Sequence, residues 1–147
     1  MAAVRRADAT WEGNLTSGSG VVSANTSRSF TDLPVSWASR TAAPDGRTSP
    51  EELLAAAHAS CFAMALAHNL NGVGTPPQRL EVSATVTFDQ VGGGWRVVSS
   101  ALTVRGQVQG ADSAAFQQAA EAAKDGCPIS QALKGNVDLS VEATLAT

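Results

Sequence analysis

Positive charge is scarce in this sequence. Its 147 residues include 10 Lys and Arg against 13 Asp and Glu, which gives a formal net charge of -3. A protein that follows a nucleic-acid backbone needs clustered Lys and Arg to neutralise phosphates. The charge balance therefore argues against nucleic acid as a partner.

An export signal is also missing from the start of the sequence. Arg5 and Arg6 are not followed by the apolar run that a secretory or twin-arginine signal contains. The longest apolar stretch, residues 53–70, is interrupted by histidine, serine and asparagine and is built of alanine rather than leucine. This composition favours a buried helix over a membrane span. We therefore expect a cytoplasmic protein that makes no use of a membrane.

Cysteine occurs only twice, as Cys61 and Cys127. In a reducing cytosol, two widely spaced cysteines are more often catalytic, metal-binding or inert than a structural crosslink. Pro128 follows Cys127, which predicts that Cys127 caps a helix start, where the helix dipole favours a thiolate and a lowered pKa. Cys61 lies more than two turns inside a helix, where burial raises a thiol pKa, so a nucleophilic Cys61 needs a cation from elsewhere in the fold.

The length of 147 residues suits a single domain over residues 1–147. The order of expected elements indicates an α+β fold with antiparallel sheet packed against helices. The expected elements are a β-hairpin at 9–24, an extended segment or a strand plus a long loop at 25–47, helices at 48–72, 112–124 and 127–135, and strands at 80–88, 95–108 and 137–145.

The helix at 48–72 has clear signals at both ends. Ser49 is the expected N-cap, Pro50 occupies the first helical position, and Glu52 completes a capping box. Asn71 and Gly72 supply the stop. Apolar residues cover most of its circumference, so we expect a buried central helix that is covered on nearly every side. Its many alanines permit close approach of another backbone.

The two cysteines have less specific readings as well. A single buried cysteine in an alanine-rich helix commonly packs as a small hydrophobic residue. His58 and Cys61 are three residues apart on one helix face, and Cys127 could join them as a metal ligand, although a fourth ligand is lacking. A metal- or small-ligand-binding protein that uses His58, Cys61 and Cys127 is therefore the alternative to a redox enzyme.

Three segments together resemble the OsmC/Ohr family, the osmotically inducible and organic hydroperoxide resistance proteins of bacteria. They are WEG at 11–13, TSPEELLAAAHASCFAMAL at 48–66 and GCPISQALK at 126–134. Their order and spacing agree with the family over nearly the whole chain. Trp11, Arg40 and the histidine before the first cysteine look like the OsmC branch.

The resemblance implies an intertwined homodimer that acts as a thiol peroxidase without metal, haem or flavin. Cys61 matches the cysteine that attacks organic hydroperoxides, and hydrogen peroxide less well, while Cys127 matches the resolving cysteine. Arg40 matches the activating arginine and Glu51 the glutamate that orients it, with Arg28 and Arg47 as alternatives in the same region. The family also suggests a lipoyl-type dithiol as the reductant.

The chemistry of a peroxide agrees with these residues. A thiolate can displace an alkoxide from the weak O–O bond, and a guanidinium offers fixed donors to the developing charge. The organic group of the substrate needs apolar walls. The candidate walls are Phe62, Met64, Phe30, Leu33 and Trp37, each of which, taken singly, is more typical of a protein core.

Helix geometry leads to an expectation about the dimer. Glu51 and Cys61 are ten residues apart, which is about 15 Å along an ideal helix. Their side chains cannot meet within one straight helix. If Glu51 orients an arginine beside Cys61, we expect it to come from a partner chain, so that each active site uses both subunits.

Overall fold

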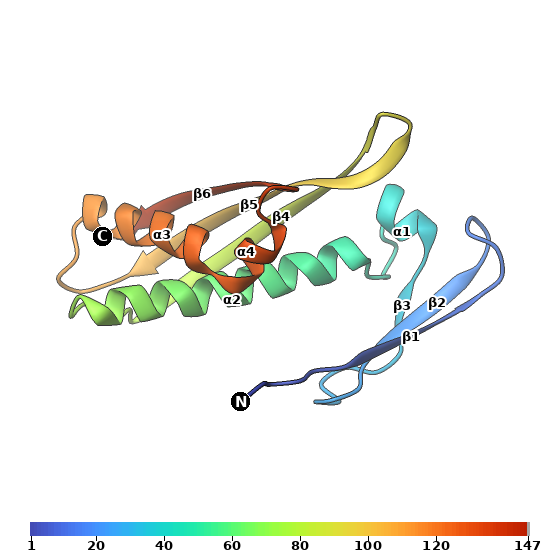
Figure 1. Cartoon of the computed structure of the whole chain (residues 1–147), viewed down its shortest axis with the longest axis horizontal. Helices are drawn as coiled ribbons and strands as arrows, with labels where there is room; N and C mark the ends of the chain where they lie inside the picture. Colours follow the sequence, from blue (N-terminus) through green and yellow to red (C-terminus); the bar gives the residue numbers. More distant parts are fainter. Residues whose placement is uncertain (147) are drawn as a thin grey trace. The chain divides into compact units, whose positions relative to one another are not determined.

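The structure is a computed structural model that describes residues 1–146, and the chain divides into two compact units, residues 1–53 and residues from 54 onward. The prediction of a single domain over residues 1–147 is not decided by this division and stays a prediction. The first unit contains β1 (Ala7–Glu12), β2 (Ser19–Ala24), β3 (Leu33–Val35), α1 (Trp37–Thr41) and the start of α2 (Pro50–Gly72). The second contains the rest of α2, β4 (Arg79–Val91), β5 (Gly94–Gln107), α3 (Ser113–Gly126), α4 (Pro128–Leu133) and β6 (Asp138–Leu145) (Figure 1).

The first unit is a three-stranded antiparallel sheet in the order β1-β2-β3. The hairpin predicted at 9–24 is confirmed as β1 and β2, in which Trp11 pairs with Gly20. A Cβ at Gly20 would lie 2.7 Å from the Trp11 ring and 2.6 Å from the Thr10 carbonyl oxygen. Glycine at this position therefore lets the indole lie flat across the neighbouring strand.

A short helix, α1, follows β3. The Ser36 hydroxyl accepts from the Ser39 N–H at 3.0 Å, and the Ser39 hydroxyl accepts from the Ser36 N–H at 3.1 Å. This reciprocal capping lets five residues form a helix. Residues 25–47 were expected to be an extended segment or a strand plus a long loop, so that prediction was wrong over Trp37–Thr41.

The second unit has a three-stranded sheet in the order β4-β5-β6. The pair β4 and β5 is antiparallel, as expected, but β5 and β6 are parallel. The prediction of purely antiparallel sheets was therefore wrong for β6. The connection from β5 to β6 carries α3 and α4, and a crossover of that length allows the chain to return in the same direction.

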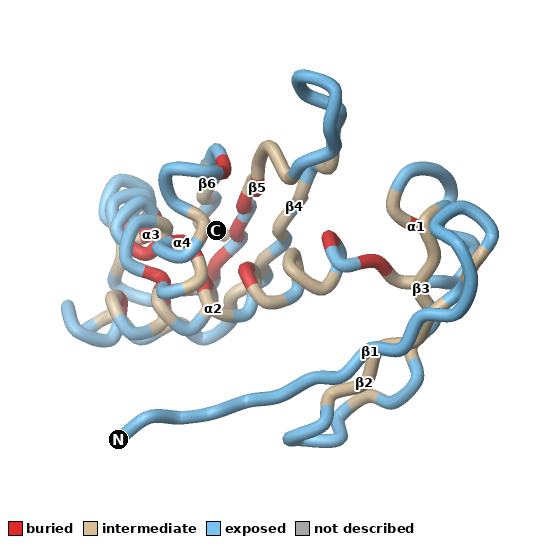
Figure 2. The backbone as a smooth tube through the Cα atoms, turned by 45° about the vertical axis from the view of Figure 1, so that its right-hand side comes forward, coloured by how far each residue is buried: buried red, intermediate tan, exposed pale blue. Residues whose placement is uncertain are grey.

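The core of the second unit lies between one face of this sheet and helices α2 and α3. From α2 it takes Phe62, Leu66 and Leu70, which are spaced four residues apart and are at most 1% exposed. Helix α3 adds Phe116 and two alanines, against apolar residues of all three strands. Buried residues accordingly follow β5 and the adjoining helix faces (Figure 2).

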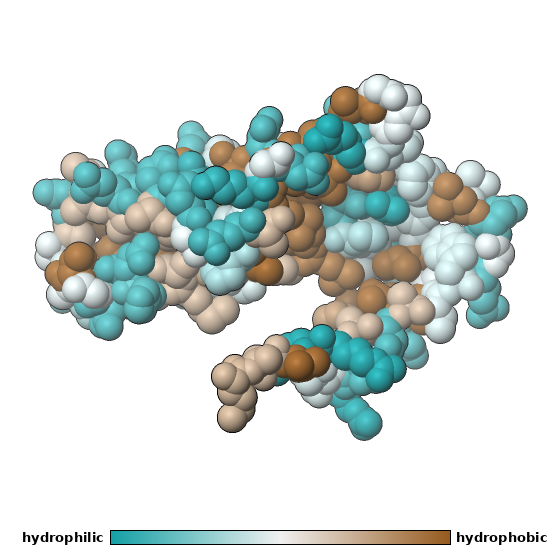
Figure 3. Space-filling model, in the orientation of Figure 1, coloured by the Kyte–Doolittle hydropathy of each residue, from teal (hydrophilic) through white to brown (hydrophobic). Residues whose placement is uncertain are grey.

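Helix α2 is not covered on all sides within the described chain. Only 22% of its most apolar 18-residue window is buried, and Met64 is 69% exposed. Pale brown, apolar surface is visible on the side of the second unit where α2 runs (Figure 3). By length and composition alone the helix could cross a membrane, a test that core helices of soluble proteins also pass. The expectation of a helix covered on nearly every side was therefore wrong for the single chain.

The ends of α2 agree with the sequence signals in most respects. The Ser49 hydroxyl accepts from the Glu52 N–H at 3.1 Å, which confirms the N-cap. The Glu52 carboxylate accepts instead from the Thr48 hydroxyl at 2.7 Å, so the second half of the predicted capping box is replaced. The helix ends at Gly72 as expected.

Candidate active site

The two cysteines meet in the second unit. The Sγ atoms of Cys61 and Cys127 are 2.7 Å apart, and both residues are free thiols. Cys127 is fully buried at the junction where α3 ends and α4 begins, whereas Cys61 is half-buried on α2. A disulfide between them needs only a small further approach, because a bonded pair of sulfurs is about 2.05 Å apart.

The surroundings of Cys61 do not favour its thiolate. Burial raises the pKa of the Cys61 thiol, and the contact with Cys127 raises it further. The backbone N–H of Ile129, in the first turn of α4, donates to the Cys61 sulfur and opposes part of this rise in pKa. A backbone amide in the first turn of α4 thus acts on the cysteine of α2.

Arg40 and Glu51 form a two-pronged ion pair in the first unit. The Arg40 Nε donates to Glu51 Oε1 at 3.0 Å and its Nη2 donates to Oε2 at 2.8 Å. Glu51 is buried at the start of α2, and the guanidinium also lies 5.5 Å from the centre of the Trp37 ring. The fork of Arg40 is therefore held in one orientation, with part of it still exposed.

The other two arginines considered from the sequence lie elsewhere. Arg47 contacts the exposed Asp45 at 3.8 Å, and Arg28 occupies an exposed turn with a positive φ of 56°. Of the three arginines in the region, Arg40 is therefore the one that the fold pairs with Glu51.

A small cavity of about 280 Å³ opens beside Arg40 within the first unit. Its walls are mainly apolar and come from β1, the β1–β2 turn, β3, α1 and the first residue of α2. The lining residues are Trp11, Leu15, Val35, Ser36, Trp37, Arg40 and Pro50. An organic group of modest size fits a space of this kind, next to a guanidinium that can hold oxygen atoms.

Only one of the five predicted wall residues, Trp37, lines this cavity. Leu33 lies in β3 and is half-buried, as is Phe30 in the preceding loop. Phe62 is fully buried in the core of the second unit, and Met64 projects to the surface of α2. Sequence reasoning missed Trp11, Leu15 and Val35, although Trp11 stands in the WEG segment that had already been singled out.

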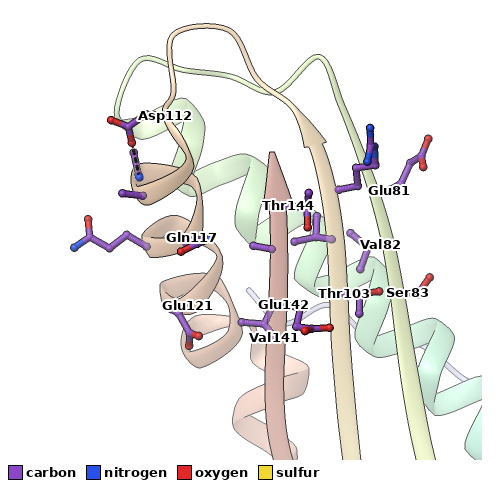
Figure 4. A pocket seen from close by; sticks show the side chains of 16 residues that line it. Glu81, Val82, Ser83, Thr103, Asp112, Gln117, Glu121, Val141, Glu142 and Thr144 are labelled. Carbon is purple, nitrogen blue, oxygen red and sulfur yellow. Dashed lines mark hydrogen bonds between the residues drawn. The ribbon is translucent and has the colours of Figure 1, made fainter. Parts of the chain in front are cut away.

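A larger groove of about 1190 Å³ lies away from both cysteines in the second unit. It runs along α3 and the sheet, where Glu81, Gln117, Glu121 and Glu142 are among the side chains at its border (Figure 4). It contains no nucleophilic sulfur and no ion pair of the Arg40–Glu51 kind, so its size alone does not make it the site of chemistry.

Comparison with known proteins places this chain in a family. The family model described as OsmC-like protein matches residues 43–142, which include Glu51 and both cysteines. The chain belongs to the OsmC-like protein family. It is 36% identical over 138 residues to a protein named peroxiredoxin OsmC from Escherichia coli (strain K12), covering 94% of this chain and 95% of the relative.

Solved structures of OsmC-like relatives agree with the fold. The organic hydroperoxide resistance protein OhrB of Bacillus subtilis has a TM-score of 0.75 at 27% identity, covering 95% of this chain and 98% of that one. A structure from Vibrio cholerae O1, with captopril bound in one of its active sites, has a TM-score of 0.74 at 26% identity and covers 97% of this chain and 94% of that one. The arrangement of two small sheets and a long central helix is therefore the fold of the OsmC-like family.

His58, the remaining candidate ligand of the metal alternative, is engaged by hydroxyl groups. Its Nδ1 lies 2.6 Å from the Ser100 Oγ and its Nε2 lies 2.8 Å from the Ser130 Oγ. Within residues 1–146, no group of three or more His, Cys, Asp and Glu side chains is placed to hold a metal ion. This OsmC-like chain therefore holds His58 in a buried hydrogen-bond network, and the arrangement does not support the metal alternative.

Proposed function

We propose that this OsmC-like protein is a cysteine-based peroxidase of the cytoplasm that reduces organic hydroperoxides to alcohols, and hydrogen peroxide less well. The observation that carries the proposal is the 2.7 Å separation of two free thiols that are 66 residues apart in sequence. The peroxiredoxin name of the relative at 36% identity supports the same reaction.

The proposed reaction has two chemical steps before reduction. The Cys61 thiolate attacks the distal peroxide oxygen, the O–O bond breaks, and the alkoxide takes a proton to leave as an alcohol, so that Cys61 becomes a sulfenic acid. The Cys127 sulfur then attacks the Cys61 sulfur, hydroxide leaves, and it takes the Cys127 proton to form water and a disulfide. A dithiol, of the lipoyl type by the family resemblance, supplies the two electrons that restore both thiols.

The cavity beside Arg40 is the proposed binding site for the substrate. The guanidinium would hold the peroxide oxygens while Trp11, Trp37 and the other apolar walls contact the organic group. A captopril molecule in an active site of the Vibrio cholerae relative indicates that such sites admit small organic molecules. Apolar walls give hydrogen peroxide nothing to contact, which is the reason for expecting weaker activity on it.

The active thiol needs a cation, and we infer that a second subunit supplies it. Arg40 is bound to Glu51 at the start of α2. Cys61 lies ten residues after Glu51 on this helix, which corresponds to about 15 Å along the axis of an ideal helix. A two-fold antiparallel pairing through the exposed apolar face of α2 would bring the start of one helix towards the middle of its partner. The protein would then be a homodimer in which Arg40 and Glu51 of one subunit complete the site of the other.

The proposal is tested by following the consumption of cumene hydroperoxide and hydrogen peroxide in the presence of a dithiol. We expect Cys61→Ser to be inactive because it lacks the nucleophile. Cys127→Ser should reduce one equivalent of peroxide and then stall or overoxidise, because its sulfenic acid has no resolving thiol. Multiple turnovers by Cys61→Ser, or wild-type protein inert to both peroxides, would contradict the proposed function.

A further inference from the structure

A buried hydrogen-bond network in the second unit joins three elements through one histidine. His58 of α2 is fully buried, and its two ring nitrogens contact the hydroxyls of Ser100 on β5 and Ser130 on α4 at 2.6 and 2.8 Å. Both serines are also buried, at 0% and 1% exposure. One ring nitrogen of a neutral imidazole donates and the other accepts, so both serine hydroxyls have a matching partner.

The network lies one helical turn from each cysteine. His58 precedes Cys61 by three residues on α2, and Ser130 follows Cys127 by three residues on α4. Residues three apart on a helix lie on the same face. The contact between His58 and Ser130 therefore runs beside the contact between the two sulfurs and links the same two turns of chain.

Helix α4 is too short to be stable without contacts to other elements. It has only six residues, and isolated helices of that length are unstable in water. The Cys127 backbone carbonyl accepts from the Gln131 N–H at 2.9 Å, so Cys127 is part of the first turn of α4. Ser100, at the other end of the network, belongs to the central strand of the β4-β5-β6 sheet and satisfies the second ring nitrogen, while the position of His58 is set by its own helix α2.

We propose that His58 is a positioning residue for disulfide formation, which holds the Cys127 turn of α4 against the Cys61 turn of α2 through Ser130. This inference rests on the proposed peroxidase function. After the first step Cys61 carries an additional oxygen, and the Cys127 sulfur must attack the Cys61 sulfur from the side opposite that oxygen. A fixed α4 keeps this attack ahead of a second peroxide, which would convert the sulfenic acid to a sulfinic acid.

The experiment separates the two chemical steps in the full-length protein. Rapid-mixing kinetics with cumene hydroperoxide give the rate of Cys61 oxidation and the rate of disulfide formation, and intact mass gives the fraction of sulfinic acid. The key comparison is Ser130→Ala with Ser100→Ala, since each removes one hydroxyl from the same buried ring. His58→Leu removes both contacts, His58→Gln retains a donor and an acceptor, and His68→Gln changes the exposed histidine of the same helix as a control.

We expect Ser130→Ala and His58→Leu to slow disulfide formation roughly tenfold or more, with more sulfinic acid and a much smaller effect on the first step. His58→Gln should recover part of the rate, and His68→Gln should match the wild type. Ser100→Ala should lower thermal stability about as much as Ser130→Ala but slow the second step much less.

Equal slowing by the two alanine variants, or no slowing by Ser130→Ala, would overturn the positioning role, because either result would make the network only structural. If His58→Leu does not fold, the serine comparison still decides the question. Wild-type protein whose Cys61 does not react with peroxide would instead contradict the proposed function. The two failures are therefore distinguishable.

Discussion

At the scale of single residues, the reactive thiol is in an unfavourable place until a charge is brought to it. Burial raises the pKa of the Cys61 thiol, and within the described chain the group that acts in the opposite direction is the Ile129 N–H. A backbone amide carries only a partial charge, whereas a guanidinium carries a full one. In the proposed shared site, the Arg40 guanidinium would lower the pKa of the Cys61 thiol more than this amide does.

The first residue-scale prediction concerns Arg40→Lys. Lysine retains the charge, but it cannot repeat the two parallel hydrogen bonds to Glu51 at 3.0 and 2.8 Å. We expect kcat/KM for cumene hydroperoxide to fall about 100-fold, the loss typical of removing one preorganised donor. Arg47→Lys is the matched control, since Arg47 has only a 3.8 Å contact with the exposed Asp45. Equal activity of the two variants would show that Arg40 has no special role.

The second residue-scale prediction concerns the pH dependence of stability. Burial lowers the pKa of His58 below its usual 6.5, and the ring contacts only neutral hydroxyls in its hydrogen bonds. Below pH 6.5 the unfolded chain binds a proton that the folded chain resists, so stability falls as the pH falls. The free energy of unfolding falls for this reason by at most about 1.4 kcal/mol for each pH unit below 6.5, and His58 causes no such loss above pH 6.5.

Urea unfolding at pH 7.5 and 5.5 measures this contribution. The loss of unfolding free energy between the two pH values should be smaller in His58→Gln than in the wild type, because glutamine does not titrate. Other titrating groups are common to both proteins and cancel in the comparison. An identical loss in both proteins would mean that His58 titrates normally in the folded state.

At the scale of elements, the packing of α3 on the sheet depends on a glycine, Gly106, at the point of contact. A Cβ at Gly106 of β5 would lie 2.5 and 2.6 Å from the ring of the fully buried Phe116 of α3. Contacts that short force the helix or the ring to move. Because α3 leads directly into Cys127, its seat on the sheet also sets where the resolving thiol lies.

We expect Gly106→Ala to lower the free energy of unfolding by about 1–3 kcal/mol, as overpacked core positions do. Gly94→Ala, in the same strand, is the control, since no atom lies within 4 Å of its added Cβ and its φ is not in the left-handed region. It should change stability by less than about 0.5 kcal/mol. Chemical denaturation monitored by circular dichroism gives both values, and similar results for the two variants would contradict the packing argument.

Elements with strong local signals could be predicted from the sequence, and those that depend on tertiary contacts could not. The strict alternation at 80–88 and the cap at Ser49 indicated β4 and α2 correctly. The five residues of α1 are too few to show a helical period, although the pair Ser36 and Ser39 gave a usable capping signal. Helices α3 and α4 carry the chain back along the sheet, so that β6 runs parallel to β5. The alternation of apolar and polar residues is the same for a strand of either direction and could not predict this.

At the scale of the whole molecule, the sequence is informative about chemistry and less so about assembly. Nothing in the spacing of Cys61 and Cys127 requires that they meet; the family resemblance supplied that expectation, and the structure places the sulfurs 2.7 Å apart. The pairing of Arg40 with Glu51 was likewise expected from the family resemblance alone, and the structure shows it. The alanines of α2 predicted close approach of another backbone, but the apolar pattern did not predict that a face of the helix is open within the chain. An apolar helix has the same pattern whether it is covered by its own chain or by another.

The last prediction uses this difference to test whether the proposed active sites are shared between subunits. Inactive Cys61→Ser and inactive Glu51→Ala chains are mixed, unfolded and refolded together. In a mixed dimer, the intact Glu51 and Arg40 of the first chain would face the intact Cys61 of the second, so one of two sites is restored. Random pairing makes about half of the dimers mixed, and about a quarter of wild-type activity should return.

A second mixture provides the matched control. Cys61 and Cys127 lie in contact within one chain, so Cys61→Ser mixed with Cys127→Ser cannot assemble a complete cysteine pair in any site. Turnover in this mixture should not exceed that of the separate variants. Recovery in the first mixture but not in the second is the pattern that a shared site requires, since sites formed within single chains would recover in neither. Recovery in both would mean instead that the cysteines pair across subunits, contrary to the contact seen within the chain.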